Sequence, residues 1–331
     1  TVGGSVLAKV GFTTTIPVEV LFAAGVVPVD LNNVFIGDPA AGDLVEVAER
    51  AGYPRNVCAW IKGIYGAVLK DPGLRRVVAV TQGDCSNTHA LMETLEFEGV
   101  EVIPFAYPYD RDRKLLQVQI ERLMEYFGVG WPEVEAAKAE LDAVRAKVRE
   151  IDHLTHSADK VTGEENHYYQ VCCSDFQGDV EAYARKVDSF LEGVKERPPR
   201  PARLRLGYIG VPPIFSDLYP YLEERGARVV YNETQRQFAM PYAAPDLVDQ
   251  YLLYTYPYGI FYRLRDITKE IERRKIAGVI HYAQSFCFRQ IEDLIIRRVL
   301  KIPVLTLEGD RPGPLDARTR VRIDAFLEML G

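Results

Sequence analysis

Two cysteines occupy matching positions in two similar segments of the sequence. TQGDC is followed by a stretch of helical periodicity and then by VEVIPF, and AQSFC is followed in the same way by IPVLTL. The segments lie 202 residues apart. Residues 77–110 align with the later copy without a gap, which sets Gln82 opposite Gln284 and Cys85 opposite Cys287. Either the match is an internal repeat, or it is a chance similarity between two strand–helix–strand units.

A third cysteine precedes another stretch of helical periodicity. Cys58 follows Asn56, a residue typical of helix N-caps, at the start of a predicted helix over 57–69. Cys58, Cys85 and Cys287 would then each lie at a helix N-terminus, where free N–H groups and the helix dipole favour thiolates. An iron–sulfur cluster is an anion held by thiolates, so the three could form one site. The alternative is that they are small buried apolar residues.

The other two cysteines, Cys172 and Cys173, are adjacent in YYQVCCSDFQGD. Adjacent cysteines seldom bind one metal together, so we predict a packing role for this pair. No C-x-x-C pair is present, which argues against a ferredoxin-type or zinc-ribbon site. Five cysteines at uneven spacing do not indicate a disulfide framework, and a reducing cytoplasm is the expected location.

Strands alternate with helices at both ends of the sequence. VVAVT (77–81) is continuously apolar, as strands of a parallel sheet covered on both faces are. Residues 112–198 instead have the pattern of charged, Ala-rich helices, and the Pro- and Arg-rich ERPPRPAR (196–203) indicates a linker. The pattern predicts an α/β fold of two doubly wound parallel-sheet (Rossmann/flavodoxin-like) domains with a helical insert. The expected division is 1–111, 112–202 and 203–331.

The predicted elements have approximate limits. Helices are expected over 13–25, 57–69, 86–98, near 214–225, near 245–273, near 289–300 and over 316–330, and strands over 26–31, 77–81 and 100–105 and at LRLGYIG, ARVVYNET, AGVIHYA and IPVLTLEGD. Cys85 and Cys287 then lie just beyond the carboxyl ends of two strands, where doubly wound domains bind their ligands. If the domains face each other, the two loops meet across a cleft.

Several polar residues accompany these cysteines. His281 and Gln284 approach Cys287, and Gln82 holds the equivalent place before Cys85; they could orient a ligand, or close the loops structurally. Glu308 ends the last predicted strand and could transfer protons. Arg289 could offset cluster charge or bind an anion, or lie solvated on a helix surface.

Composition excludes some classes of function. The chain has 331 residues, 47% of them hydrophobic, and a net charge of −7, which argues against broad nucleic-acid binding. No apolar run is long enough to span a membrane, so no membrane-spanning segment is expected. The aromatic run YLLYTYPYGIFYR (251–263) could line a dry pocket or a dimer contact, or belong to the core.

Nearly the whole chain resembles the family of 2-hydroxyacyl-CoA dehydratase and benzoyl-CoA reductase subunits, which includes the double-cubane cluster proteins. The resemblance is carried by TTIPVEVLFAAGVVPVDL, Cys58, the strand–Cys85 segment, HYAQSFCFRQIEDL and IPVLTLEGDRPGPLDARTRVRIDAFLEML, in that order. It implies two similar α/β domains and one [4Fe–4S] cluster per subunit, with Cys58, Cys85 and Cys287 as ligands and one iron without a cysteine.

The resemblance also implies partners and a mechanism. Such proteins work as dimers and receive low-potential electrons from a separate ATP-dependent iron–sulfur activator. Dehydratases recycle one electron through a ketyl radical, whereas reductases consume electrons and ATP in each turnover. A double-cubane [8Fe–9S] cluster would need a second set of three cysteines, from an identical or a paralogous subunit. No CoA-binding motif is recognisable, so an acyl-CoA substrate rests on the resemblance.

Two functions follow as hypotheses. The first is an oxygen-sensitive iron–sulfur subunit, acting as a radical hydro-lyase or as a reductase on a small molecule. The second is a cluster-free, two-domain protein that closes on a small ligand.

Overall fold

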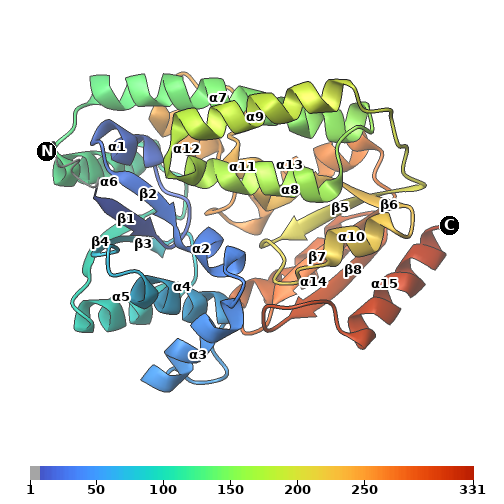
Figure 1. Cartoon of the computed structure of the whole chain (residues 1–331), viewed down its shortest axis with the longest axis horizontal. Coiled ribbons are helices and arrows are strands. Elements are labelled where there is room, and N and C mark those ends of the chain that lie inside the picture. The colour runs from blue at the N-terminus through green and yellow to red at the C-terminus, as the bar shows by residue number, and fades with distance from the viewer. Residues whose placement is uncertain (1–7) are drawn as a thin grey trace, which may run out of the picture.

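The computed structural model describes residues 8–331, which form two four-stranded parallel sheets surrounded by helices (Figure 1). The strand orders are β2-β1-β3-β4 and β6-β5-β7-β8. The strands are β1 (Lys9–Phe12), β2 (Val27–Asp30), β3 (Arg76–Gln82), β4 (Glu101–Ala106), β5 (Leu204–Gly210), β6 (Ala227–Asn232), β7 (Gly278–Gln284) and β8 (Val304–Gly309). This architecture confirms the predicted fold class of two doubly wound parallel-sheet domains.

The segments that match in sequence hold equivalent places in the two sheets. β3 pairs with β1 through Gly11 and Val77, and β7 pairs with β5 through Gly207 and Val279. In each sheet the chain runs from the first strand to one side and then crosses to the other side for the third strand. The repeat detected in the sequence is therefore a repeat of topology, and Cys85 and Cys287 follow corresponding strands.

The helices cover both faces of the sheets and connect them. They are α1 (Val18–Ala23), α2 (Leu31–Gly37), α3 (Ala41–Ala51), α4 (Ala59–Lys70), α5 (Thr88–Phe97), α6 (Arg113–Phe127), α7 (Trp131–Ser157), α8 (Gly163–Val171), α9 (Val180–Lys195), α10 (Leu218–Glu223), α11 (Glu233–Phe238), α12 (Leu247–Leu253), α13 (Ile260–Arg274), α14 (Asp293–Val299) and α15 (Ala317–Leu330). Short 3-10 helices lie at Cys172–Ser174, Phe176–Gly178 and Phe288–Glu292. The long helix α7 extends alongside both sheets (Figure 1).

Two helices differ from the sequence-based expectation. The helix expected over 13–25 is confined to α1, because Pro17 marks its start and Gly25 takes a positive φ of 67° just after its end. The long helix expected near 245–273 is split into α12 and α13 by the segment 254–259, which contains Pro257 and Gly259. The short elements β1, α2, α3 and α11 were not predicted.

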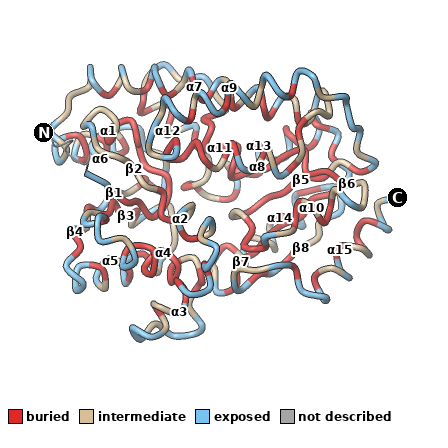
Figure 2. The backbone as a smooth tube through the Cα atoms, in the orientation of Figure 1, coloured by how far each residue is buried: buried red, intermediate tan, exposed pale blue. Residues whose placement is uncertain are grey.

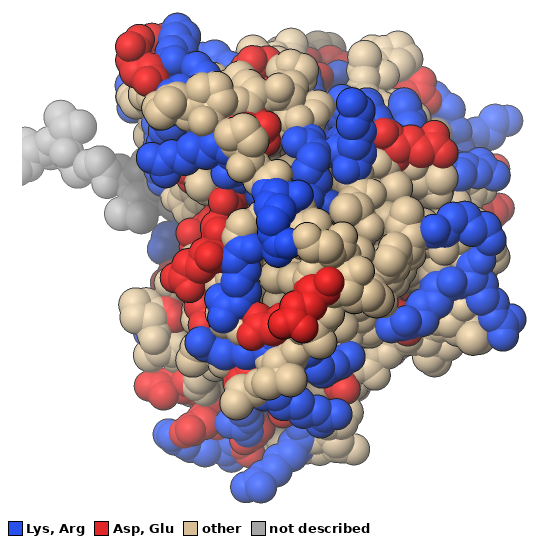
Figure 3. Space-filling model, turned by 90° about the vertical axis from the view of Figure 1, so that its right-hand side faces the viewer, with Lys and Arg blue, Asp and Glu red and all other residues tan. Residues whose placement is uncertain are grey.

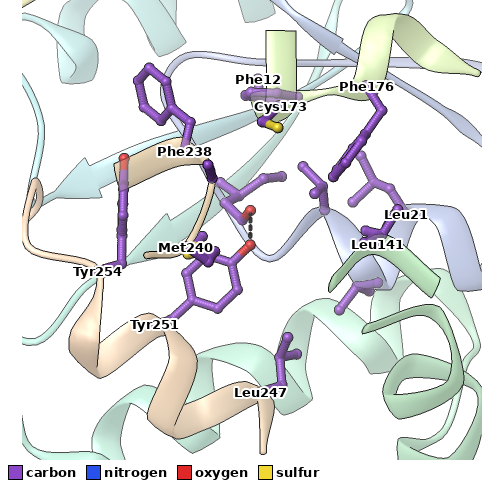
Figure 4. Packing of buried hydrophobic residues seen from close by; sticks show 14 of the residues in the cluster. Phe12, Leu21, Leu141, Cys173, Phe176, Phe238, Met240, Leu247, Tyr251 and Tyr254 are labelled. Carbon is purple, nitrogen blue, oxygen red and sulfur yellow. Dashed lines mark hydrogen bonds between the residues drawn. The ribbon is translucent and has the colours of Figure 1, made fainter. Parts of the chain in front are cut away.

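The buried residues follow the strands and the inner sides of the helices (Figure 2). All seven residues of β7 are buried, including the polar His281 and Gln284, because a central parallel strand is covered on both faces. The largest core cluster joins β1, β3 and β4 to α1, α7 and the aromatic residues Tyr251 and Tyr254 (Figure 4). Cys172 and Cys173 belong to this cluster as buried free thiols, which agrees with the packing role predicted for them.

A second core cluster joins the N-terminal part of the chain to the C-terminal sheet. Phe35 of α2 and Ala59 of α4 share this cluster with Tyr208 of β5 and Tyr282 of β7. The cluster therefore fixes the start of α4, and with it Cys58, against the second sheet.

Close contact between α3 and α4 depends on a glycine. A Cβ atom added at Gly66 would lie 2.2 Å from the backbone oxygen of Leu44, so we expect Gly66→Ala to lower the unfolding free energy by roughly 1–3 kcal/mol. The matched control is Gly193→Ala in α9, where a new Cβ meets nothing within 4 Å. This control should raise stability by up to about 1 kcal/mol. Urea unfolding measures the change in unfolding free energy in both variants, which should be negative for Gly66→Ala and positive for Gly193→Ala. Equal changes would contradict the close contact between α3 and α4.

A buried ion-pair network ties α7 to α13. Asp152 accepts hydrogen bonds from Nη1 and Nη2 of Arg274 at 2.8 and 2.6 Å and from Asn166 at 3.0 Å. Burial alone would raise the pKa of Asp152, but the Arg274 guanidinium outweighs it and holds this pKa well below its ordinary value.

The lowered pKa predicts a pH-dependent contribution to stability. A carboxyl group with a lowered folded-state pKa stabilises the fold above its unfolded-state pKa of about 3.9, and this contribution is lost as the pH falls below that value. The stability difference between the natural chain and Asp152→Asn should therefore be largest near neutral pH and shrink below about pH 4. Urea unfolding at several pH values measures it, and a difference independent of pH would refute the argument.

The surface carries charges of both signs. On the face that Figure 3 shows, Lys and Arg are interspersed with Asp and Glu and neither sign covers the face. Among the helices of residues 8–331, none has the length and apolar character needed to cross a membrane.

Candidate metal centre between the two sheets

A cavity of about 110 Å³ lies where the carboxyl ends of the strands of both sheets meet. Loops that follow the first and third strands of each sheet line it, which are the topological switch points where doubly wound sheets bind ligands. Its lining includes Thr13, Thr14 and Thr15 after β1, Asp84 and Cys85 after β3, Val211, Pro212 and Pro213 after β5, and Gln284, Cys287, Phe288 and Arg289 after β7.

Three cysteines from separate elements meet in this cavity. Cys58 directly precedes α4, Cys85 lies in the loop between β3 and α5, and Cys287 directly precedes the short 3-10 helix Phe288–Glu292. Each of the three thiols lines the cavity, whereas Cys172 and Cys173 do not belong to its lining. The fold thus separates the five cysteines into the same two groups that the sequence suggested.

The environment of these thiols favours their neutral form. Burial raises the pKa of Cys58 to about 12, and the neighbouring thiols of Cys287 and Cys85 add to this effect. Burial, with the nearby carboxyl of Asp84, likewise raises the pKa of Cys85 to about 12, and burial raises that of Cys287. Thiolates are therefore stable here only with a compensating cation, as a metal supplies.

Backbone N–H groups already point at the sulfur atoms. The N–H groups of Trp60 and Ile61 lower the pKa of the Cys58 thiol, that of Asn87 lowers the pKa of Cys85 and that of Arg289 lowers the pKa of Cys287, each against the larger effect of burial. N–H···S hydrogen bonds of this kind stabilise thiolates and tune the potential of an iron–sulfur cluster. Each bond comes from the start of the following helix or turn, as the helix N-terminus argument predicts.

In the part of the chain that the structure describes, the three thiols do not form a site for a single metal ion. Within residues 8–331, no three His, Cys, Asp or Glu side chains converge at the spacing that one metal ion requires. In a cubane each thiolate binds a different iron, so its sulfur ligands need not converge on one point. Three thiols around one cavity, each with an N–H donor, are consistent with such a cluster.

Two carboxyl groups share the lining, and the sequence did not single them out. Burial raises the pKa of Asp30, the N-cap of α2, whose Oδ1 accepts a hydrogen bond from the Asn32 N–H at 2.9 Å. Burial also raises the pKa of Asp84 to about 7, although the positive charge of Arg289 opposes the shift. Both follow the carboxyl end of a strand, a position that could have marked them in the sequence.

Two predicted residues line the cavity with their side chains already engaged. Arg289 is 9% exposed, and its guanidinium donates to the Tyr256 carbonyl at 2.9 Å and lies 4.7 Å from the Tyr256 ring centre. Gln284 is buried; its Oε1 accepts from Tyr282 at 2.6 Å and its Nε2 donates to the Asp310 carbonyl at 2.9 Å.

Three predicted residues lie outside the cavity lining. His281 is buried and its Nδ1 pairs with Asp293 at 2.7 Å, while burial lowers its pKa. Glu308 is exposed and accepts a hydrogen bond from Ser285 at 2.9 Å. Gln82 is exposed at the end of β3. These three can act on the cavity only through other residues.

Further polar groups reach the cavity from elements that the sequence did not connect to it. His167 of α8 lines it; burial lowers the pKa of His167 to about 4, and its Nδ1 lies 3.0 Å from Nε2 of Gln235. Thr15 Oγ1 and Trp60 Nε1 are buried without a hydrogen-bond partner among the described residues. Unpaired buried polar atoms at a cavity are available to a ligand.

Comparison with known proteins assigns a family to nearly the whole chain. The family model described as 2-hydroxyglutaryl-CoA dehydratase, D-component, matches residues 13–330. Among curated proteins no match is found. The matched region contains both complete sheets except for the short strand β1, and all residues that line the cavity.

Proposed function

This chain belongs to the 2-hydroxyglutaryl-CoA dehydratase D-component family, and from that we propose that it is an iron–sulfur subunit of a 2-hydroxyacyl-CoA dehydratase-like system. Family membership supports a dehydratase-type component. The proposal adds a [4Fe–4S] cluster in the cavity between the sheets, held by Cys58, Cys85 and Cys287.

One observation carries the proposal. Three cysteines that are far apart in the sequence line one cavity at the switch points of both sheets, and each accepts a backbone N–H. Buried cysteines with a packing role alone would not need to meet at the ligand-binding edge of two domains. The cluster would supply electron transfer and, at an iron without a cysteine ligand, Lewis-acid chemistry.

The residues of this chain would prepare the cavity for that chemistry. The backbone N–H groups near the three sulfur atoms would favour the thiolates, and Arg289 places a buried positive charge next to them. Thr15 and Trp60 offer free polar atoms that can bind a substrate. The carboxyl groups of Asp30 and Asp84 line the same space and can exchange a proton with a bound substrate.

The remaining roles are proposed on weaker grounds. Gln284, at the cavity wall, would position substrate, and catalytic roles for His281 and Glu308 and a cluster-binding role for Gln82 stay predictions. The division into 1–111, 112–202 and 203–331 is likewise proposed.

The proposed system needs partners. An ATP-dependent iron–sulfur activator would deliver electrons to the chain in the cytoplasm. A second subunit, identical or paralogous, would complete the dimer, and it would provide the second set of cysteines if the cluster is a double-cubane [8Fe–9S] cluster. We propose dehydration as the reaction, because the matching family model is described as a dehydratase component.

Anaerobic purification tests the function. We expect brown protein with about four iron and four acid-labile sulfide per chain, and loss of colour in air. The chain should dehydrate a 2-hydroxyacyl-CoA when it is mixed with an activator ATPase of the same kind of system, ATP and a reductant. Far less than one ATP should be hydrolysed for each product molecule formed. Colourless anaerobic protein without sulfide would refute the proposal and favour a cluster-free small-ligand-binding protein. ATP consumption in every turnover would instead identify a reductase.

A further inference from the structure

A second cavity, distinct from the cysteine cavity, lies among α7, α8, α11 and α13. Its volume is about 390 Å³, within the range of small-molecule sites. We propose that this cavity, which we call the α7–α13 pocket, binds a small phosphate-bearing ligand. The proposal does not depend on the function of the cysteine cavity. It rests on the residues that line the α7–α13 pocket: Arg149, Asp152, His153, His156, Gln170, Arg236, Ala239, Pro241, Tyr242, Lys269, Glu270 and Arg273.

An arginine in this pocket has no acidic partner. The side chain of Arg149 donates through Nη1 to the carbonyls of Ala239 and Met240 at 3.0 and 3.1 Å. No carboxylate of the described residues forms a salt bridge with it, since the nearby Asp142 is paired with Lys138 and Arg145. A partly buried guanidinium without a counter-ion is costly, and a bound anion would relieve that cost.

A fully buried amide in the pocket also lacks partners. Gln170 is 0% exposed, and neither its Oε1 nor its Nε2 has a hydrogen-bond partner among the described residues. Leaving both ends of a buried amide unpaired is unusual in folded proteins and indicates a missing ligand or water. Gln170 lines the α7–α13 pocket from α8, whereas His167 and Val171 of the same helix line the cysteine cavity.

The charges that line the pocket leave an excess of positive charge. Four cationic residues, Arg149, Arg236, Lys269 and Arg273, line it against two acidic ones. Arg236 is paired with Asp266 at 2.9 Å and Arg273 with Glu270 at 2.6 Å, so the excess positive charge belongs to Arg149 and Lys269, which form no salt bridge with the described residues. Both acidic groups are already neutralised within the network. Asp152 forms an ion pair with Arg274, and Glu270 forms ion pairs with Arg273 and Arg274. The shortest N···O distance in each of the three pairs is 2.6 Å.

The arrangement of donors favours phosphate over carboxylate. Arg149, Gln170 and Lys269 lie on three different helices, α7, α8 and α13, so they approach the pocket from different directions. A tetrahedral phosphate accepts hydrogen bonds on several oxygens at once, whereas a carboxylate has only two oxygens in one plane. The pocket is much larger than a phosphate group, which leaves room for an organic part beside Tyr242.

Calorimetric titration of the full chain with inorganic phosphate tests this site, with potassium chloride holding the ionic strength constant. We expect saturable binding of one phosphate per chain. Lys269→Met and Arg149→Met should each weaken binding about tenfold or more, since each removes a charged hydrogen-bond donor. Lys114→Met is the matched control, because Lys114 is also an exposed helical lysine but lies on α6, and it should bind as the natural chain does.

Three outcomes would overturn the proposal: no saturable phosphate binding, unchanged affinity in Lys269→Met, or acetate binding as tightly as phosphate. Lys269 is exposed and its loss leaves the buried network intact, so this variant decides the matter even if Arg149→Met does not fold. Gln170→Leu adds an independent readout. It should weaken phosphate binding while leaving the ligand-free chain as stable or more stable, because it removes two unpaired polar atoms.

Discussion

Cys85→Ser is expected to lose most of the iron and acid-labile sulfide that the natural chain retains after anaerobic purification, from about four of each per chain to less than one. The substitution keeps nearly the same shape but removes one of the three thiolates that the cavity offers. Two cysteines and a hydroxyl leave two irons of a cubane without a cysteine ligand. Cys58→Ser and Cys287→Ser should have the same effect, because all three thiols line the same cavity.

The other two cysteines provide the control. Cys172→Ser and Cys173→Ser change a buried thiol in the core cluster outside the cavity, so iron and sulfide should stay at the level of the natural chain. Iron analysis, sulfide analysis and the visible absorption spectrum should be measured on folded, anaerobic protein. Retention of the full cluster in Cys85→Ser, or its loss in Cys173→Ser with the fold intact, would refute the assigned ligand set.

Arg145→Met is expected to lower the unfolding free energy by about 3–5 kcal/mol. Arg145 and Glu19 form a buried ion pair at 2.7 Å, in which the side chains are 1% and 0% exposed. The pair joins α7 to α1, just beyond the loop that lines the cysteine cavity. Without the guanidinium, the Glu19 carboxylate keeps only the neutral donors Gln250 and Tyr251, at 2.7 and 2.8 Å.

The control is an exposed pair of the same chemical type. Arg185 lies 3.5 Å from Glu181 on the surface of α9, with side chains 69% and 83% exposed, and Arg185→Met should change stability by less than about 0.5 kcal/mol. Each variant removes one positive charge, so urea unfolding of the two compares the contributions of a buried and an exposed arginine to the unfolding free energy. Similar effects in both would show that the Glu19–Arg145 pair is not a major determinant of stability.

The strands were predictable because their chemistry is local. A central parallel strand is covered on both faces, so most of its residues are apolar, as in VVAVT at 77–81 and in GVI at the start of β7. The internal repeat was equally visible, because two copies of one topology place Cys85 and Cys287 at the same point after corresponding strands. The four-residue strand β1 gave no such signal, since Lys9 and Gly11 interrupt its apolar residues.

Helix limits were harder to predict where part of the predicted helix is a loop that lines the cavity. Residues 13–16 are three threonines and an isoleucine, whose β-branched side chains disfavour a helix, and they form the loop after β1 that lines the cavity with Thr13, Thr14 and Thr15. The segment 254–259 interrupts a helical pattern and brings Tyr256 to the same cavity. There, contacts with the rest of the fold outweigh local propensity.

The sequence alone determined the fold class and the repeat, because these depend on periodicity and on position after a strand. It also proposed Cys58, Cys85 and Cys287 as ligands in place of the adjacent pair, because each precedes a predicted helix and matches the family that the chain resembles. Only the tertiary structure could decide that the three thiols share one cavity, since that depends on how two sheets face each other. It also brought Asp30, Asp84 and His167 to that cavity and placed Gln170 unpaired in the α7–α13 pocket. Burial and hydrogen-bond partners are properties of the packed chain, and no local pattern encodes them.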